Sequence, residues 1–181
     1  MKSRFVYIIL ATMLVILVAP FIRHSGITGH LITTLMAAMI PLTSFYALTA
    51  DRSRAIGILL IAAPFVILDG MSLFFTTRYL MIASIGFGTI LYLYIIVLLV
   101  INLLSYRVVT ADLIYCAIST YFLIGVMWAG MYIILEGISP GSFSGISETS
   151  DLLYFSFVTL TTVGFGDITP QSIPVFRNYL F

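Results

Sequence analysis

The sequence predicts an all-α membrane protein, a multi-pass transmembrane helical bundle with one short helix and loop that enter the membrane part-way and turn back. Hydrophobic residues make up 61% of the 181 residues and charged residues 8%, and the mean hydropathy is +1.18. No soluble domain of this length has such a composition. The apolar residues form five long runs and one short run, separated by segments that hold most of the charge.

The five long runs are expected to be membrane spans, and they cover residues 5–22, 27–50, 55–75, 79–104 and 111–135. At 1.5 Å per residue, each nearly or fully crosses a hydrocarbon core of about 30 Å. The first run follows Lys2 and Arg4, as a secretory signal would. Pro20 directly after Ala19, together with the later apolar runs, favours a retained span instead.

The basic residues predict the orientation. With a cytoplasmic amino terminus, five of them lie inside and three outside, which agrees with the positive-inside rule. The inside set is Lys2, Arg4, Arg52, Arg54 and Arg107, and the outside set is Arg23, Arg78 and Arg177. This orientation, in the cell membrane, places the segment after the fifth run outside.

The sixth apolar run is too short to span. It follows residues 136–145, which are rich in glycine, serine and proline and are expected to form an exposed loop. Ser150 and Asp151 then give a helix-start signal before residues 152–160. Because nine or ten residues cannot cross the membrane, this helix is expected to enter it and turn back, with its negative carboxyl end near Thr161.

The next residues have glycine at alternate positions, Gly164 and Gly166, within the string 161–167. A run of backbone carbonyls can face one axis only if the backbone alternates in handedness, and glycine reaches positive φ at little cost. Val163 and Phe165 are then expected to face away and to brace the loop. Such carbonyls can replace the water around a dehydrated cation.

Residues 151–167 resemble the pore helix and selectivity filter of potassium channels, a family whose filter loop has this composition. The resemblance covers about residues 111–174 and implies a homotetramer that conducts K⁺. It implies that Thr162, Val163, Gly164 and Phe165 coordinate K⁺, that Gly166 ends the filter, and that Asp167 lies at the outer mouth. The implied pore-helix support is Tyr154, Phe155, Val158 and Thr161.

The sequence departs from the commonest family pattern at two positions. Phe165 stands where tyrosine is most usual, so the filter loses one hydroxyl, while the carbonyl that faces the ion is unaffected. Val158 stands where some relatives carry a glutamate that pairs with the filter aspartate. We therefore expect Asp167 to lack that partner, with altered filter stability but retained conduction.

The chain is expected to divide into residues 1–107, a four-helix region similar to a voltage-sensor domain, and residues 108–181, the pore domain. Residues 79–104 contain no arginine or lysine, so steep voltage gating is not expected. Residues 174–181 are too few for the inner helix that follows the filter in the family. We expect a partial chain that does not conduct as written.

Asp69 is the one acid well inside a span, where an ionisable residue is by default a functional candidate. It lies near the outer end of its run, so hydrogen bonds to Ser72 or a neighbouring span favour a structural role over a proton or ion role. His30 is expected at the membrane interface. Cys116 is the single cysteine, which excludes an internal disulfide and a thiolate metal cluster.

Other classes of function are weaker alternatives. One is a non-conducting regulatory membrane subunit, and another is a potassium transporter with a channel-like pore loop. The sequence shows neither a nucleophile paired with a base nor a phosphate-binding loop, so an enzyme is not expected. No cofactor is expected apart from K⁺ as permeant ion. The net charge of +1, without a basic run, predicts no nucleic-acid partner.

Overall fold

The computed structural model describes residues 4–22, 26–48, 52–72, 74–75, 77–105 and 108–171. Five long helices are followed by a short strand, a short helix and a second short strand. The long helices are α1 (Val6–Ile22), α2 (Gly26–Ala47), α3 (Arg52–Ser72), α4 (Arg78–Ser105) and α5 (Ala111–Ile138). The remaining elements are β1 (Phe143–Ser144), α6 (Asp151–Leu160) and β2 (Thr169–Pro170).

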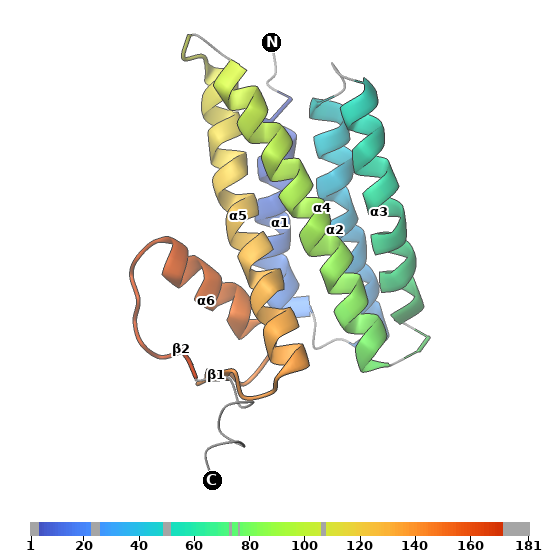
Figure 1. Ribbon diagram of the computed structural model, residues 1–181, viewed down its shortest axis with the longest axis vertical. Coiled ribbons are helices and arrows are strands. Elements are labelled where there is room, and N and C mark those ends of the chain that lie inside the picture. Colours follow the sequence, from blue (N-terminus) through green and yellow to red (C-terminus); the bar gives the residue numbers. More distant parts are fainter. Residues whose placement is uncertain are drawn as a thin grey trace.

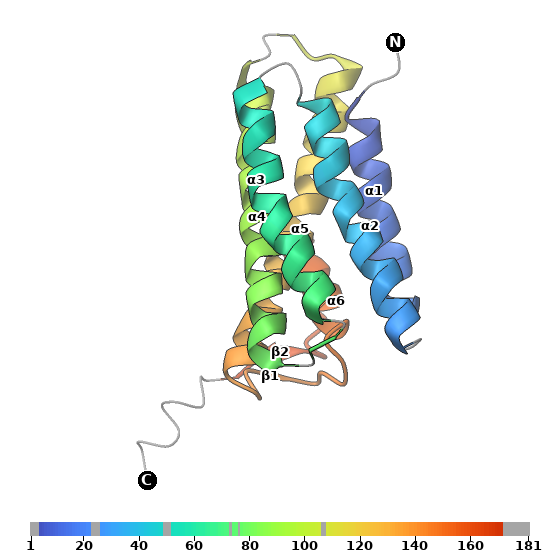
Figure 2. The ribbon, with the colours of Figure 1, turned by 90° about the vertical axis from the view of Figure 1, so that its right-hand side faces the viewer.

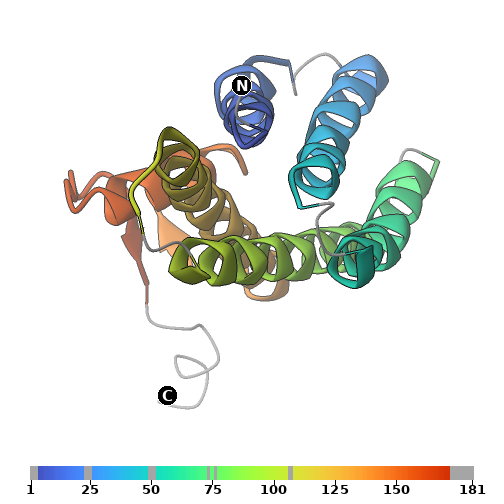
Figure 3. The same cartoon turned by 90° about the horizontal axis from the view of Figure 1, so that it is seen from above.

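The five long helices lie side by side and run alternately in opposite directions (Figures 1 and 2). Each packs against the next, and α5 also packs against α1, so the helices close a ring when seen from above (Figure 3). The start of α1 and the end of α5 lie at opposite ends of the bundle (Figure 1). A division between residues 107 and 108 stays a prediction.

Each of the five predicted apolar runs contains one long helix, which confirms the all-α membrane class. Among the described residues, three helical stretches are long and apolar enough to cross a membrane: Thr28–Ala47, α4 and α5. The apolar parts of α1 and α3, Val6–Val18 and Ile56–Ser72, are shorter. The 17 residues of α1 extend about 26 Å at 1.5 Å per residue, slightly less than a typical hydrocarbon core.

The bundle is apolar both inside and outside. Ile8, Ile58, Leu91 and Leu123 are fully buried between the helices. Large apolar side chains also cover the outer surface, including Leu10, Leu17, Leu35, Leu60 and Leu104. A water-soluble monomer rarely exposes so much apolar surface, whereas a lipid-facing bundle requires it.

The segment after α5 leaves the bundle and returns to the same end (Figure 1). β1 pairs with β2 in antiparallel register, Phe143 opposite Pro170 and Ser144 opposite Thr169. The short helix α6 lies between the two strands in the chain and packs against α5. Its bounds confirm the predicted short helix over 151–160, and the pairing of β1 with β2 was not predicted.

The expectation that residues 136–145 form an exposed loop is wrong in two respects. Helix α5 continues to Ile138, and Ser142 and Phe143 are buried. The glycine and proline content signals irregular backbone, but tertiary contacts decide whether that backbone is exposed. Several residues used for the orientation lie outside the described residues, namely Lys2, Arg23, Arg107 and Arg177, as does the stretch 174–181.

Candidate ion-conducting site

Helix α6, which precedes the candidate site, packs closely against α5. The buried hydroxyl of Ser156 donates a hydrogen bond to the backbone carbonyl of Gly125 at 2.6 Å. A Cβ added at Gly125 would lie 2.5 Å from the ring carbon Cζ of Phe157, so only glycine leaves room for this ring. This small residue therefore allows α6 to lie directly against the backbone of α5.

An aromatic cluster holds the start of the segment. The ring of Tyr132 on α5 lies 5.4 Å from Phe143 on β1 and 5.2 Å from Phe155 on α6, between centroids. Phe143 and Phe155 are 5.5 Å apart in an edge-to-face arrangement, which is a favoured geometry for ring pairs. Phe155 and Val158, both expected to support the helix, are buried.

The start of α6 carries the predicted acid. Asp151 Oδ2 accepts hydrogen bonds from the backbone N–H groups of Ser147, at 2.7 Å, and Glu148, at 2.9 Å. A carboxylate in the first turn also suits the positive end of the helix dipole. Ser150 makes no side-chain cap, so the helix-start signal acts through Asp151.

At its other end, α6 binds the first N–H groups of the following loop. The N–H groups of Thr161 and Val163 donate to the carbonyls of Phe157, at 2.9 Å, and Val158, at 3.1 Å. The Thr161 hydroxyl also donates to the Phe157 carbonyl, at 2.7 Å. Thr161 is thus bonded to the end of the helix, and the loop begins with its N–H donors turned back toward the helix.

The backbone of the loop alternates in handedness. The φ angles of Thr162, Gly164 and Gly166 are +59°, +55° and +78°, whereas Val163 and Phe165 between them are not at positive φ. Gly164 and Gly166 therefore have the positive φ that the sequence predicted. Thr162 was not predicted, and it is the one non-glycine residue at positive φ among those described.

Strain at Thr162 marks this loop as unusual. A left-handed conformation costs about 1–2 kcal/mol for a residue with a Cβ. The β-branched side chain of threonine is more crowded in this conformation than an unbranched one. Such outliers persist where the surrounding structure imposes them, often at functional sites. Neither the threonine itself nor its neighbours gave a sequence signal for this conformation.

The carbonyl oxygens of residues 162–166 are available to a ligand. Within the described part of the chain, none of the hydrogen bonds in the structure ends on these oxygens. Five consecutive carbonyls without protein donors are a set of hard oxygen ligands, the kind that replaces water around a monovalent cation.

The side chains between the alternating positions are exposed in the single chain, and their bracing role stays a prediction. Val163 is 52% exposed and Phe165 is 70% exposed. A second expectation was that Asp167 lacks the glutamate partner of some relatives, because Val158 stands at that position. In the structure, the hydroxyl of Tyr154 donates to Asp167 Oδ2 at 2.8 Å.

This contact favours the charged carboxylate. The hydrogen bond from Tyr154 lowers the pKa of Asp167 below its ordinary value of 3.8. The two residues are thirteen positions apart, on the helix and on the loop after it. Sequence reasoning placed both at the site but could not pair them, because their contact depends on how the loop folds back.

Hydrogen bonds on and beside β1 and β2, here called the strap, join the point where the segment leaves the bundle to the point where it returns. The hydroxyls of Ser144 and Thr169 lie 2.7 Å apart across β1 and β2, and the N–H of Gln171 donates to the Ser142 carbonyl at 2.7 Å. Gly145, with φ +78°, lies against the carbonyl of Asp167, where a Cβ would not fit. The strap therefore fixes both ends of the loop at one end of the bundle.

Comparison with known proteins gives one family match. A family model described as "Ion channel" matches residues 113–177, which include nearly all of α5, the strap, α6 and the alternating loop. No curated protein and no solved structure matches the chain.

Proposed function

We infer that this chain, whose residues 113–177 carry an ion channel domain, is a subunit of a potassium-selective channel that conducts K⁺ passively through a tetrameric filter. The observation that carries the proposal is the alternating backbone of residues 162–166, whose carbonyls accept no hydrogen bond within the described chain. No cofactor is required beyond the permeant ion.

The roles of the filter residues follow from their order along the loop. Thr162 supplies a hydroxyl and a carbonyl to the innermost site, and Val163, Gly164 and Phe165 supply carbonyls to the sites above it. Gly166 ends the run and Asp167 lies at the outer mouth. Rings of such carbonyls replace the hydration shell of K⁺.

Helix α6 supports a cation at this position electrostatically. Its carboxyl end is at Leu160, next to the start of the filter. The end of a helix carries a partial negative charge of about half an elementary charge. This charge stabilises a partly dehydrated cation and disfavours an anion.

A complete ring of carbonyls needs several copies of the chain, because each chain supplies one filter loop. The exposed side chains of Val163 and Phe165 provide surface for neighbouring copies to cover. Four copies, as in potassium channels, place the four loops around one axis. We therefore propose a homotetramer.

The topology supports entry of the filter from the outer side of the cell membrane. The strap lies at the end of the bundle opposite the start of α1 (Figure 1). A cytoplasmic amino terminus, which the distribution of basic residues favours, then puts the strap and Asp167 outside.

The front half lacks the charge that a voltage sensor moves. Helix α4 contains no lysine or arginine after Arg78, its first residue. The guanidinium of Arg78 donates to the carbonyl of Gly137 at 2.8 Å through Nε, so it is held at the end of α5. The energy that a membrane potential supplies is proportional to the charge that moves through it. We therefore expect weak voltage dependence of gating.

The proposal is tested by cation flux into liposomes that contain the protein. Uptake of K⁺ driven by its own gradient should exceed uptake of Na⁺ by about tenfold or more. Equal uptake of both ions would contradict selectivity. No uptake would favour a non-conducting subunit, and uptake that requires a second ion gradient would favour a transporter.

A further inference from the structure

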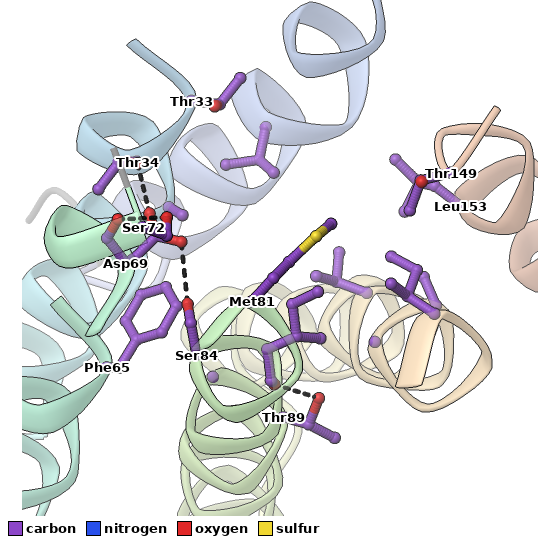
Figure 4. A pocket seen from close by; sticks show the side chains of 18 of the residues that line it. Thr33, Thr34, Phe65, Asp69, Ser72, Met81, Ser84, Thr89, Thr149 and Leu153 are labelled. Carbon is purple, nitrogen blue, oxygen red and sulfur yellow. Dashed lines mark hydrogen bonds between the residues drawn. The ribbon is translucent and has the colours of Figure 1, made fainter. Parts of the chain in front are cut away.

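A cavity of about 330 Å³ lies away from the filter, between α2, α3, α4 and α5 and the start of α6. Its size falls in the range of pockets that bind small molecules, about 300–1,000 Å³. Figure 4 shows Thr34, Asp69 and Ser84 on one side of this space and Thr149 and Leu153 on the other. Met81 extends from α4 between the two sides (Figure 4).

A carboxylate forms the polar end of the cavity. The hydroxyl of Ser84 on α4 donates to Asp69 Oδ1 at 2.9 Å, and the hydroxyl of Thr34 on α2 contacts Asp69 Oδ2. Ser72 donates to the backbone carbonyl of Asp69 at 2.6 Å. The expectation that a neighbouring span would satisfy Asp69 is therefore met by two spans, and the carboxylate is held in place from both sides.

His30 on α2 is part of this cluster. Its Nε2 lies 3.2 Å from the Ser72 hydroxyl and its Nδ1 lies 3.2 Å from the Thr34 hydroxyl. Both ring nitrogens thus face hydroxyls, and the carboxylate of Asp69 receives only neutral donors in the described network.

The described arginine side chains are engaged elsewhere. The guanidinium of Arg4 lies 5.6 Å from the ring centroid of Tyr46, and Arg78 donates to Gly137. The carboxyl group of Asp69 therefore faces the cavity without a cationic partner among these groups. An ionised carboxylate offers about four acceptor positions, so it can take further donors.

The rest of the wall is largely apolar and indicates the shape of the occupant. Phe65, Met81, Ile85, Val126 and Leu153 line the cavity beyond the carboxylate. A single inorganic ion would leave most of this volume empty. A molecule with one cationic head and a small apolar body matches both parts of the cavity.

We propose that this cavity binds a small protonated amine, with its ammonium group on Asp69 and its apolar body against Phe65, Val126 and Leu153. A charge-assisted hydrogen bond to a carboxylate gives the head group its selectivity. The occupant also touches Ser150 and Leu153, at the start of the helix that leads to the filter. The site does not depend on ion conduction, so its test is independent of the filter proposal.

The test is calorimetric titration of the full chain in detergent with benzylammonium, with benzyl alcohol as the neutral analogue of similar shape. Benzylammonium binds the wild type, and Asp69→Asn weakens this binding by about tenfold or more. Asp112→Asn is the matched control, because Asp112 lies in the first turn of α5 and does not line the cavity. It should leave the affinity unchanged.

A second variant separates loss of binding from loss of folding. Ala37 lines the cavity on α2, and Ala37→Leu fills it while leaving Asp69 and its hydroxyl partners in place. This variant should lose benzylammonium binding with an unchanged thermal melting curve. The proposal is overturned if the wild type does not bind benzylammonium, if Asp69→Asn binds it equally well, or if benzyl alcohol binds as tightly.

Discussion

The hydroxyl of Tyr154 donates a hydrogen bond to Asp167, from the second turn of α6 to the residue that follows the filter. This bond ties the end of the alternating loop back to α6, the helix from whose carboxyl end the loop begins. Together with the strap at Ser144 and Thr169, it fixes the end of the loop against the rest of the segment. The geometry of the carbonyls therefore depends on contacts outside the filter itself.

Replacement of Tyr154 by phenylalanine should raise the pKa of Asp167 toward its ordinary value. In the wild type, the hydrogen bond lowers this pKa below 3.8, so its stabilising contribution is present above that pH and is lost as the pH falls through the lowered pKa. Carboxyl NMR of Asp167 during a pH titration measures the shift. Tyr132→Phe is the control, and an identical titration in Tyr154→Phe would contradict the assigned contact.

The left-handed position of Gly164 should be essential for conduction. Gly164→Ala places a Cβ at φ +55°, which costs about 1–2 kcal/mol, and the loop relieves this strain by turning a carbonyl away from the axis. Gly141→Ala imposes a similar strain at φ +83° outside the filter. Neither added Cβ meets another atom within 4 Å. Flux assays should show loss of K⁺ uptake only in Gly164→Ala.

The close approach of α5 and α6 should depend on Gly125. Gly125→Ala directs a Cβ into the ring of Phe157, and such overpacking costs about 1–3 kcal/mol. Denaturant unfolding in detergent measures the loss, and Phe157→Leu in the same chain should recover part of it. Gly86→Ala on α4 is the control, because nothing lies within 4 Å of its Cβ and alanine favours a helix. Equal stability of the two alanine variants would contradict the packing.

Both ends of the re-entrant segment should be accessible from the same side of the membrane. Ser147 and Gln171 are exposed before and after the filter, and Val108 is exposed at the other end of the bundle. Cysteines placed at Ser147 and Gln171 should react with an impermeant thiol reagent added outside, whereas a cysteine at Val108 should not. The native Cys116 is buried and gives little background. Labelling of Ser147→Cys and Gln171→Cys from opposite sides would show a spanning segment instead.

The sequence predicts the helices well because each depends on local apolar length. It also predicts the start of α6 at Asp151 and the positive φ at Gly164 and Gly166, since both follow from residue chemistry within a few positions. These features need no knowledge of what the chain packs against.

The missed features all depend on contacts between distant residues. The bond between Tyr154 and Asp167, the strap from Ser142 to Gln171 and the burial of Phe143 arise only when the segment folds back. Thr162 adopts positive φ because the loop on both sides imposes it, against its own preference. The cluster around Asp69 joins three helices, and no spacing along the chain reveals it.

The central claim, that the carbonyls of residues 162–166 replace water around K⁺, is tested most directly by locating the ion. Anomalous diffraction from crystals of the protein grown with Tl⁺, a heavy substitute for K⁺, should show a row of peaks on a fourfold axis beside the carbonyls of Thr162, Val163, Gly164 and Phe165. Gly164→Ala crystals should lose the peaks nearest that residue. A well-ordered loop without Tl⁺ on the axis, or with its carbonyls turned away from it, would contradict the account.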